Sequence, residues 1–399
     1  MLQKRILFLG ASQSQVAPIF YAKEQGHYVI TCDYLPENPG HKLADESHNV
    51  STTDKEAVLA LAKNLSIDGI VAYASDPAAP TQAYVANHLG LSSNPYTSVL
   101  TLSRKDLFRD FLKKHDFYVP RSKVFYDYAE AKEWLDSITL PIIVKPVDSS
   151  GSKGITQIQS KDEFKSAFEY ALKFSKEKKV IVEEFFARSG YQIGGDSFIV
   201  DGKLVFASYT NTHFDKLCNP LVPVGGSLPS VYQNDFLQNL HHELQRLLSL
   251  LKMKTGAINH EFQFDHKGNI FIVEAGARNG GNLIPELVYL ATGVDMVKYT
   301  VDAALGMDVS SLKMKEPEGF YAYYVLHALR DGRVEEIWFS DAIRKNIIKE
   351  SIYIKKGDKV KKFNGSDCTL GILLMKFYSE QEMIEKMNNM DKYLKVIVV

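Results

Sequence analysis

With 399 residues, of which 45% are hydrophobic, the chain is long enough to bury a substantial core. Its formal net charge of -1 leaves no excess of positive charge, which excludes a broad electrostatic surface for nucleic acid or an anionic membrane. The cysteines are far apart and form no CxxC or Cys/His metal pattern: Cys32, Cys218 and Cys368. No apolar run has the length of a signal-peptide core or a membrane span. We therefore expect a cytoplasmic protein with no nucleic-acid partner and no membrane segment.

Residues 1–98 alternate short apolar runs with helical segments. The predicted strands are 5–9, 28–32 and 69–73, and the predicted helices are 16–25 and 56–64. This alternation indicates an α/β unit with a parallel sheet. The turn GASQSQ at 10–15 could hold an anion at a helix N-terminus, but it lacks the second and third glycines of a dinucleotide-binding fold. Asp76, after the third strand, either faces the same crevice or caps a helix.

Two lysines and a flexible loop mark the next segment. A helix at 101–114 carries Lys105 and would bridge two domains. The strand at 140–145 (LPIIVK) ends in Lys145, whose apolar neighbours disfavour a solvated position, so this lysine needs an anion. The loop that follows contains Ser149, Ser150, Gly151, Ser152 and Gly154. It is not a Walker A motif, yet its amides and hydroxyls could fold over phosphates; a plain surface turn is the alternative.

The remainder of the chain mixes strands and helices. The predicted elements are a strand at 179–185, a hairpin at 197–208, and helices at 234–251, 284–292 and 296–305. Residues 320–399 have a mostly β pattern and could pack on the preceding sheet. The segment 211–230, with His213 and Asp215, could line a substrate pocket, although a lone histidine more often satisfies a loop backbone.

The hairpin predicted from two apolar runs at 258–264 and 269–275 carries two carboxylates. We expect a register with Phe264 opposite Asn269. In that register Glu261 faces Ile272, and Glu274 is its diagonal neighbour on the same face, about 7–8 Å away. Two acids aligned on one face of an apolar ribbon repel each other unless a cation lies between them, and Mg²⁺ carrying a nucleotide is the usual solution.

Taken together, these pieces resemble the ATP-grasp superfamily, which includes biotin carboxylase, glycinamide ribonucleotide synthetase, D-alanine ligase and L-amino acid ligases. The resemblance implies a mixed α/β and α+β fold, with an N-terminal Rossmann-like parallel-sheet domain, an ATP-grasp domain and a C-terminal mostly β domain. The implied boundaries are 1–98, 99–305 and 306–399, with a lid part at about 121–188 and a metal-binding half at about 189–305.

The resemblance also implies roles for individual residues. Lys105, Lys145 and the lid loop (Ser149, Ser150, Gly151, Ser152, Gly154) would contact the phosphates. Glu183 and Phe186 in the hinge EEFF would contact adenine, and Gln192 would contact the ribose. Glu261 and Glu274 would bind magnesium, and Arg278 and Lys145 would have catalytic roles. Arg278 would steady the transferred phosphoryl group or the substrate carboxylate.

Two departures from the family pattern stand out. The second metal strand commonly runs Glu-x-Asn-Pro-Arg, with the asparagine as a further magnesium ligand, but here Gly276 holds that position. Asn279, Asn282 or a water could substitute, which leaves the number of metal ions open. Gln192 stands in place of a ribose-binding glutamate and can still form hydrogen bonds, but without the charge.

The activity implied by the resemblance is ATP-dependent ligation of a small carboxylate to a small amine through an acyl phosphate, with release of ADP and phosphate. Its cofactors would be ATP and Mg²⁺, with Mn²⁺ as an acceptable substitute, and a homodimer is compatible with it. One alternative is a glycinamide ribonucleotide synthetase or biotin-carboxylase-like enzyme. The other is a nucleotide-binding regulator without catalysis, suggested by Gly276 and Gln192.

Overall fold

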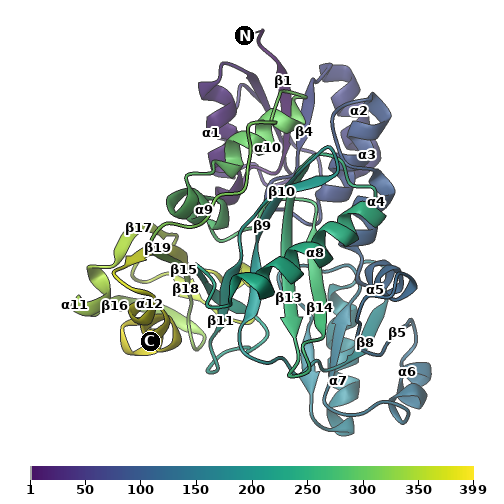
Figure 1. Cartoon of the computed structure of the whole chain (residues 1–399), viewed down its shortest axis with the longest axis vertical. Coiled ribbons are helices and arrows are strands. Elements are labelled where there is room, and N and C mark those ends of the chain that lie inside the picture. Colours follow the sequence, from purple (N-terminus) through teal and green to yellow (C-terminus); the bar gives the residue numbers. More distant parts are fainter. Residues whose placement is uncertain (1) are drawn as a thin grey trace.

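The computed structural model describes residues 2–399. Its N-terminal unit is a four-stranded parallel sheet with the order β3-β2-β1-β4 (Figure 1). The strands are β1 (Arg5–Leu9), β2 (Tyr28–Cys32), β3 (Glu46–His48) and β4 (Gly69–Val71), and the helices are α1 (Val16–Glu24), α2 (Lys55–Leu65) and α3 (Ala79–Leu89). The parallel sheet confirms the prediction. The sequence did not indicate β3, because this three-residue edge strand is polar.

The predicted helix at 101–114 is instead two helices, α4 (Tyr96–Ser103) and α5 (Lys105–Lys114). They meet at Arg104, whose backbone is extended with φ -115° and ψ 115°. The Arg104 guanidinium is paired with Asp106 and Glu177, and the amide of Lys105 donates to the carbonyl of Val147 at 2.9 Å. The break therefore puts Lys105 in the first turn of α5, beside the loop after Lys145.

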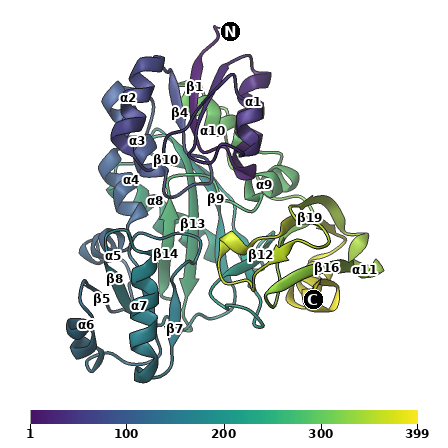
Figure 2. The same ribbon diagram turned by 180° about the vertical axis from the view of Figure 1, so that it is seen from behind.

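A smaller antiparallel sheet, with the order β5-β8-β6-β7, forms the lid side of the molecule (Figure 2). Its strands are β5 (Ser122–Phe125), β6 (Ile142–Pro146), β7 (Thr156–Ile158) and β8 (Val180–Glu184), and its helices are α6 (Tyr128–Leu135) and α7 (Phe164–Phe174). Phe125, Phe164 and Phe168 are fully buried in the core of this unit. Lys145 is thus carried on a central strand.

A nine-stranded sheet unites the middle and the C-terminal part of the chain. Its order is β14-β13-β9-β11-β12-β15-β19-β17, with β10 paired to β9. The strands are β9 (Gln192–Val200), β10 (Lys203–Ala207), β11 (Thr210–Phe214), β12 (Pro223–Leu228), β13 (Gly256–Phe264), β14 (Ile270–Gly276), β15 (Phe320–Leu326), β17 (Ile347–Ile352) and β19 (Gly371–Phe377). The C-terminal segment therefore does more than pack on the preceding sheet: β15 pairs with β12 and extends it.

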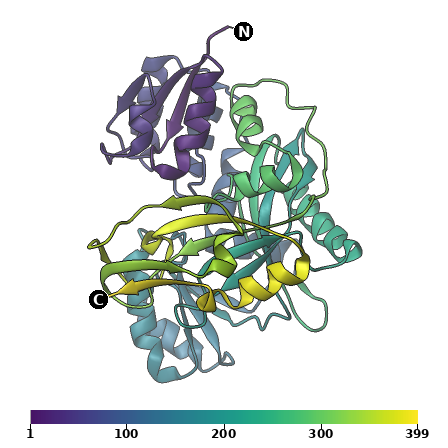
Figure 3. The ribbon, with the colours of Figure 1, turned by 90° about the vertical axis from the view of Figure 1, so that its left-hand side faces the viewer.

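Helices and a small sheet complete the molecule. They are α8 (Asn234–Leu250), α9 (Ile284–Thr292), α10 (Met296–Ala304), α11 (Asp341–Arg344) and α12 (Glu380–Asn388), with the sheet β18-β16-β20 built from β16 (Gly332–Phe339), β18 (Lys359–Val360) and β20 (Leu394–Val398). Figure 3 shows the N-terminal unit as a separate lobe beside the C-terminal strands. None of the helices within residues 2–399 combines the length and apolarity needed to cross a bilayer.

Candidate active site

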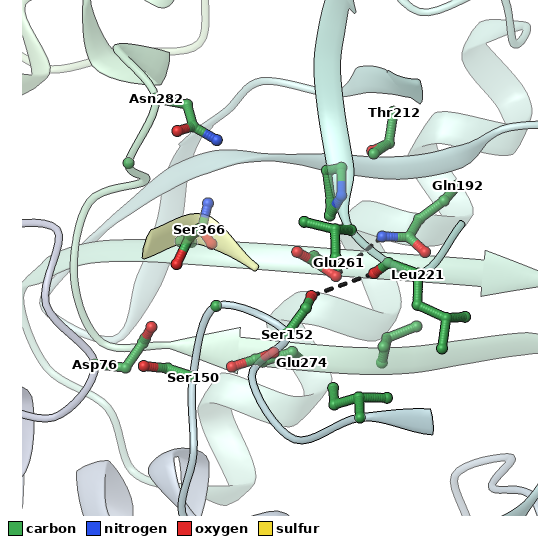
Figure 4. Close-up of a pocket in the computed structure, with 18 of the residues that line it drawn as sticks. Asp76, Ser150, Ser152, Gln192, Thr212, Leu221, Glu261, Glu274, Asn282 and Ser366 are labelled. Atoms are coloured by element: carbon green, nitrogen blue, oxygen red, sulfur yellow. Dashed lines mark hydrogen bonds between the residues drawn. The ribbon is translucent and has the colours of Figure 1, made fainter. Parts of the chain in front are cut away.

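One cavity of about 800 Å³ lies where the N-terminal unit, the lid sheet and the nine-stranded sheet meet (Figure 4). Most of the residues predicted from the sequence line it: Lys105, Lys145, Ser149, Ser150, Gly151, Ser152, Phe186, Gln192, Glu261, Glu274 and Arg278. Glu183 and Gly154 are not among the lining residues. The C-terminal segment, from which no site residue was predicted, contributes Ser366 and Tyr353 to the wall.

Glu261 and Glu274 lie directly opposite each other on β13 and β14. The predicted register, with Phe264 opposite Asn269 and Glu261 opposite Ile272, is therefore wrong. Phe264 pairs with Ile270, and an irregularity after Glu261 leaves Val273 without a partner. Because of this irregularity, Glu261 and Glu274 form a directly opposed pair. Direct neighbours have Cβ atoms about 4.5–5.5 Å apart, closer than the diagonal arrangement.

The two carboxylates are poorly compensated. Glu261 accepts one hydrogen bond, from the side-chain amide of Gln192 at 2.9 Å, while within residues 2–399 the Glu274 carboxylate has no hydrogen-bond or ion-pair partner. Burial, together with the neighbouring Glu274, raises the pKa of Glu261 to about 7. A divalent cation between the two oxygens would remove this repulsion, and oxygen ligands are those that Mg²⁺ prefers.

Arg278 lies beside these acids, with its guanidinium already bound. Its Nε donates to Oδ1 of Asp76 at 2.6 Å and its Nη2 donates to Oδ2 at 2.8 Å. Asp76 follows β4 in the N-terminal unit and lines the cavity, so it faces the crevice; the alternative, a helix cap, is wrong because α3 begins after Ala78 without a side-chain cap. This ion pair fixes Arg278 and joins the N-terminal unit to the segment that follows β14.

The ion pair also explains the glycine at the position of the expected third metal ligand. A Cβ atom on Gly276 would lie 2.9 Å from Oδ1 of Asp76 and 3.3 Å from Nε of Arg278, so a side chain would collide with the pair. Of the two asparagines considered as substitutes, Asn282 lines the cavity, whereas Asn279 is fully buried and its Oδ1 accepts a hydrogen bond from Thr300 at 3.0 Å.

The opposite wall of the cavity carries positive charge. Lys145 is paired with Glu183, and Nε of Arg109 donates to the same carboxylate at 2.6 Å. Burial by itself would raise the pKa of Glu183, but Arg109 and Lys145 lower it to about 2, while burial lowers the pKa of Lys145 to about 8. The Glu183 side chain thus faces these cations and is engaged with them.

Arg109 was missed by sequence reasoning. It lies one turn after Lys105 on α5, and its neighbours Lys113 and Lys114 make the helix look solvated. Its side chain is 3% exposed, and Phe271 lies 4.7 Å from the guanidinium carbon, measured to the ring centre. The spacing of four residues from Lys105, which puts both cations on one helix face, was the available signal.

The loop between β6 and β7 is closed onto the rest of the molecule. Lys105 donates to the carbonyl of Ser149, the Ser152 hydroxyl donates to the carbonyl of Leu221 at 3.2 Å (Figure 4), and the amide of Ser366 donates to the carbonyl of Gly151 at 3.2 Å. Gly151 has a φ of 66°. Gly154, in contrast, packs on α7, where a Cβ atom would lie 2.9 Å from Phe174.

The hinge and the residues near it complete the site. The ring of Phe186 packs on Tyr118 and Phe271, with centres 5.8 Å and 5.4 Å away. Gln192 holds Glu261 and accepts from Gln263 at 2.7 Å, so its side chain is committed to the acidic wall. His213 and Asp215 do not line this cavity; His213 is hydrogen-bonded to Ser227 and Asn388, and Asp215 to His327.

Comparison with known proteins agrees with this geometry. Residues 138–286 match the family model of the ATP-grasp domain. Formate-dependent phosphoribosylglycinamide formyltransferases are 28% identical over 186 residues in Erythrobacter litoralis (45% of this chain, 47% of that protein) and 29% identical over 191 residues in Burkholderia lata (45% and 46%). The matched region thus spans about half the length of these curated relatives.

Solved structures show the same fold over the whole chain. Phosphoribosylglycinamide synthetase from Anaerococcus prevotii has a TM-score of 0.75 at 23% identity, and L-amino acid ligase from Bacillus licheniformis has a TM-score of 0.80 at 18% identity; both comparisons cover 100% of each chain. The protein contains an ATP-grasp domain and has the ATP-grasp fold, which confirms the resemblance drawn from its motifs.

Proposed function

We propose that the protein is an ATP-dependent ligase that joins a small carboxylate to a small amine through an acyl phosphate. The observation that carries the proposal is that one cavity is lined both by the poorly compensated carboxylates of Glu261 and Glu274 and by two lysines, Lys105 and Lys145. ATP combines an anionic triphosphate with a bound Mg²⁺, so one end of it suits each wall.

The donor set fits Mg²⁺, or Mn²⁺ in its place. Glu261 and Glu274 would hold the ion through their carboxylate oxygens, and Asn282, which lines the same cavity, is a candidate for a further oxygen ligand from the chain. The ion, when bound, would neutralise negative charge on the phosphate groups. The raised pKa of Glu261 supports this assignment, because the Gln192 hydrogen bond and Arg278 do not offset burial and the neighbouring acid, and a bound cation would stabilise the charged form.

Phosphate binding is assigned to the cationic wall and the loop. Lys105 and Lys145 both face the cavity, and Ser149, Ser150 and Gly151 border it between them. Because Arg109 shares Glu183 with Lys145, the lysine side chain is held in a fixed orientation before any ligand arrives. Adenine would stack on Phe186 and bind the backbone of the hinge.

The chemistry follows from the geometry. The acceptor carboxylate attacks the γ-phosphorus of ATP, and the bond to ADP breaks. The amine then attacks the carbonyl of the acyl phosphate, phosphate leaves, and the amine proton passes to solvent or to a carboxylate. Arg278 would steady the transferred group or the acceptor carboxylate while Asp76 fixes its orientation. The closed loop excludes water that would otherwise hydrolyse the acyl phosphate.

Release of ADP across a matrix of amino acids and other small carboxylates and amines, with product mass, tests the proposal. At least one pair should give stoichiometric ADP, phosphate and a condensed product. Calorimetry of Mg-ATP binding belongs beside it: binding without turnover across the whole matrix would overturn ligation and favour a nucleotide-binding regulator.

The three thiols are free, consistent with a cytoplasmic location.

A further inference from the structure

A second group of polar side chains lies outside the cavity described above. Asp215 and Cys218 are in the loop between β11 and β12, and His327 directly follows β15. One ligand atom from each of the three residues lies within 4.8 Å of the other two. The side chain of His327 is 4% exposed and that of Asp215 is 16% exposed. Sequence analysis did not reveal this group, because Cys218 and His327 are far apart in the chain.

The ring of His327 is held in one orientation. Its Nδ1 lies 2.8 Å from the carbonyl oxygen of Val325, and since a carbonyl only accepts, Nδ1 carries a proton. Its Nε2 therefore faces Oδ2 of Asp215, at 3.0 Å. Phe363 packs on the ring with centres 4.8 Å apart. A histidine whose second nitrogen donates to a backbone carbonyl is the usual arrangement of a metal-ligating imidazole.

The loop presents the other two groups to the same point. Oδ1 of Asp215 accepts from the amide of Leu217 at 2.7 Å, and the amide of Cys218 lies 3.4 Å from the carbonyl of Asp215. This turn leaves Oδ2 and the thiol free to point at the histidine. The Cys218 sulfur lies 4.0 Å from the carbonyl oxygen of Ala328, at the outer limit for a hydrogen bond donated by sulfur, so this contact holds the thiol only weakly.

We propose that Asp215, Cys218 and His327 bind a Zn²⁺ ion, with water as the fourth ligand. A thiolate, an imidazole and a carboxylate form a donor set that suits zinc, whereas magnesium prefers oxygen alone. Cys218 also lines a second cavity of about 690 Å³, which gives the fourth ligand access to solvent. The site is separate from the carboxylate pair on β13 and β14.

The competing interpretation is a charged hydrogen bond with a bystander thiol. Burial would lower the pKa of His327, but its hydrogen bonds to Asp215 and Cys218 raise it to about 9. Such an imidazolium would pair with Asp215 without any ion. The two interpretations differ in what they demand of Cys218: the ion needs its thiolate, whereas the ion pair survives its replacement.

The position of the site connects it to the phosphate-binding loop. Leu221, three residues after Cys218, accepts the hydrogen bond of Ser152. Phe363, which packs on His327, precedes Ser366, whose amide donates to Gly151. An ion at the site would therefore fasten both segments on which the loop is anchored. Zinc has a structural role in this proposal, and it is expected to order the loop rather than to take part in phosphoryl transfer.

Metal content and Co²⁺ spectroscopy of the full-length chain test the proposal. The protein is stripped with a chelator, equilibrated with Zn²⁺ and analysed for bound metal, and Co²⁺ is substituted to reveal a thiolate charge-transfer band. Excess Mg²⁺ is included to occupy the magnesium sites. Under these conditions we expect one Zn²⁺ bound per chain and a Co²⁺ spectrum typical of a tetrahedral site with a sulfur ligand.

Variants identify the ligands. Cys218→Ser should abolish the charge-transfer band, and Asp215→Asn and His327→Gln should weaken Zn²⁺ binding at least about tenfold. Cys368→Ser is the matched control, because Cys368 lines the same second cavity but lies outside the group, and it should leave both readouts unchanged. If His327→Gln fails to fold, Asp215→Asn and Cys218→Ser still decide the result.

The proposal is overturned if the wild-type chain retains no Zn²⁺, or if Cys218→Ser leaves the affinity and the Co²⁺ spectrum unchanged. Loss of the band in Cys368→Ser alone would equally contradict it, since the ion would then lie elsewhere. Zn²⁺ binding should persist in Glu274→Gln, so the result is independent of the proposed ligase activity.

Discussion

Two glutamates on different sides of the cavity, Glu183 behind its lining and Glu261 in it, have pKa values displaced in opposite directions. Glu183, on the lid side, is held by Arg109 and Lys145, which lower its pKa to about 2 against the effect of burial. Glu261, on the nine-stranded sheet, is buried beside Glu274, and its pKa rises to about 7. The Glu183 carboxylate is therefore fully charge-paired without a ligand, whereas the carboxylates of Glu261 and Glu274 would be stabilised in their charged forms by a bound cation.

Among the variants that test this difference, Glu274→Gln is expected to have the largest effect on turnover. Removing one metal ligand should lower turnover about a thousandfold, because a metal supplies several kcal/mol of charge stabilisation. In the nucleotide-free protein the same change removes repulsion with Glu261, so thermal stability should stay equal or rise. Steady-state ADP release and thermal unfolding, with and without Mg-ATP, measure the two effects.

Glu335→Gln is the control for that experiment, because this glutamate is exposed and is paired with Lys356 far from the cavity. It should leave turnover unchanged. Full turnover in Glu274→Gln, or an equal loss in the control, would show that the acidic wall does not depend on a cation.

Glu183→Gln tests the opposite wall. It leaves Arg109 and Lys145 buried without their anion, and breaking such a pair costs roughly 3–5 kcal/mol in the free energy of unfolding. The folded-state pKa of Glu183 lies below the ordinary value of 4.5, so its contribution to stability is present above that value and is lost as the pH falls toward about 2. Urea unfolding should therefore show a gap between wild type and variant at neutral pH that narrows in acid.

Glu184→Gln is the matched comparison, since successive residues of a strand face opposite sides and Glu184 is only half-buried. It should cost little at any pH. A gap for Glu183→Gln that stays constant between neutral and acid pH would contradict the charge-paired wall.

The smallest expected effect is that of Gly276→Asn, which supplies the ligand found at this position in the family pattern. The new side chain meets the pair of Asp76 and Arg278, so it should displace Arg278 and lower turnover about tenfold rather than raise it. Adding Asp76→Ala removes the same ion pair, so ADP release by the double variant should be close to that of Gly276→Asn alone rather than a further tenfold lower. If Gly276→Asn alone is fully active, the ion pair does not position Arg278.

The sequence was informative where the chemistry is local. Lys145 at the end of an apolar strand and two acids on a predicted hairpin each carry their own signal, because burial of a charge within one element is visible in the pattern of its neighbours. The parallel N-terminal sheet follows in the same way from alternating periodicities. These features need no knowledge of what lies across the cavity.

Features that depend on distant contacts were not predictable. Asp76 and Arg278 are separated by 202 residues, and nothing near either residue specifies the other. Arg109 resembles any cation of an amphipathic helix until Glu183 is found beside it. The register of the hairpin was wrong because Val273 of β14 is skipped between the pairs Glu261–Glu274 and Phe262–Ile272, an irregularity that the apolar pattern does not reveal.

The pairing of β12 with β15 has a consequence for shortening the chain. Gly225 and Gly226 of β12 are aligned with Tyr324 and Tyr323, so residues 320–399 cover one long flank of the strand. Without them, β12 would become an edge strand with unpaired amides and carbonyls, which is a template for association between chains. A chain ending before β15 would retain every proposed ATP-contacting residue, and we expect it to aggregate.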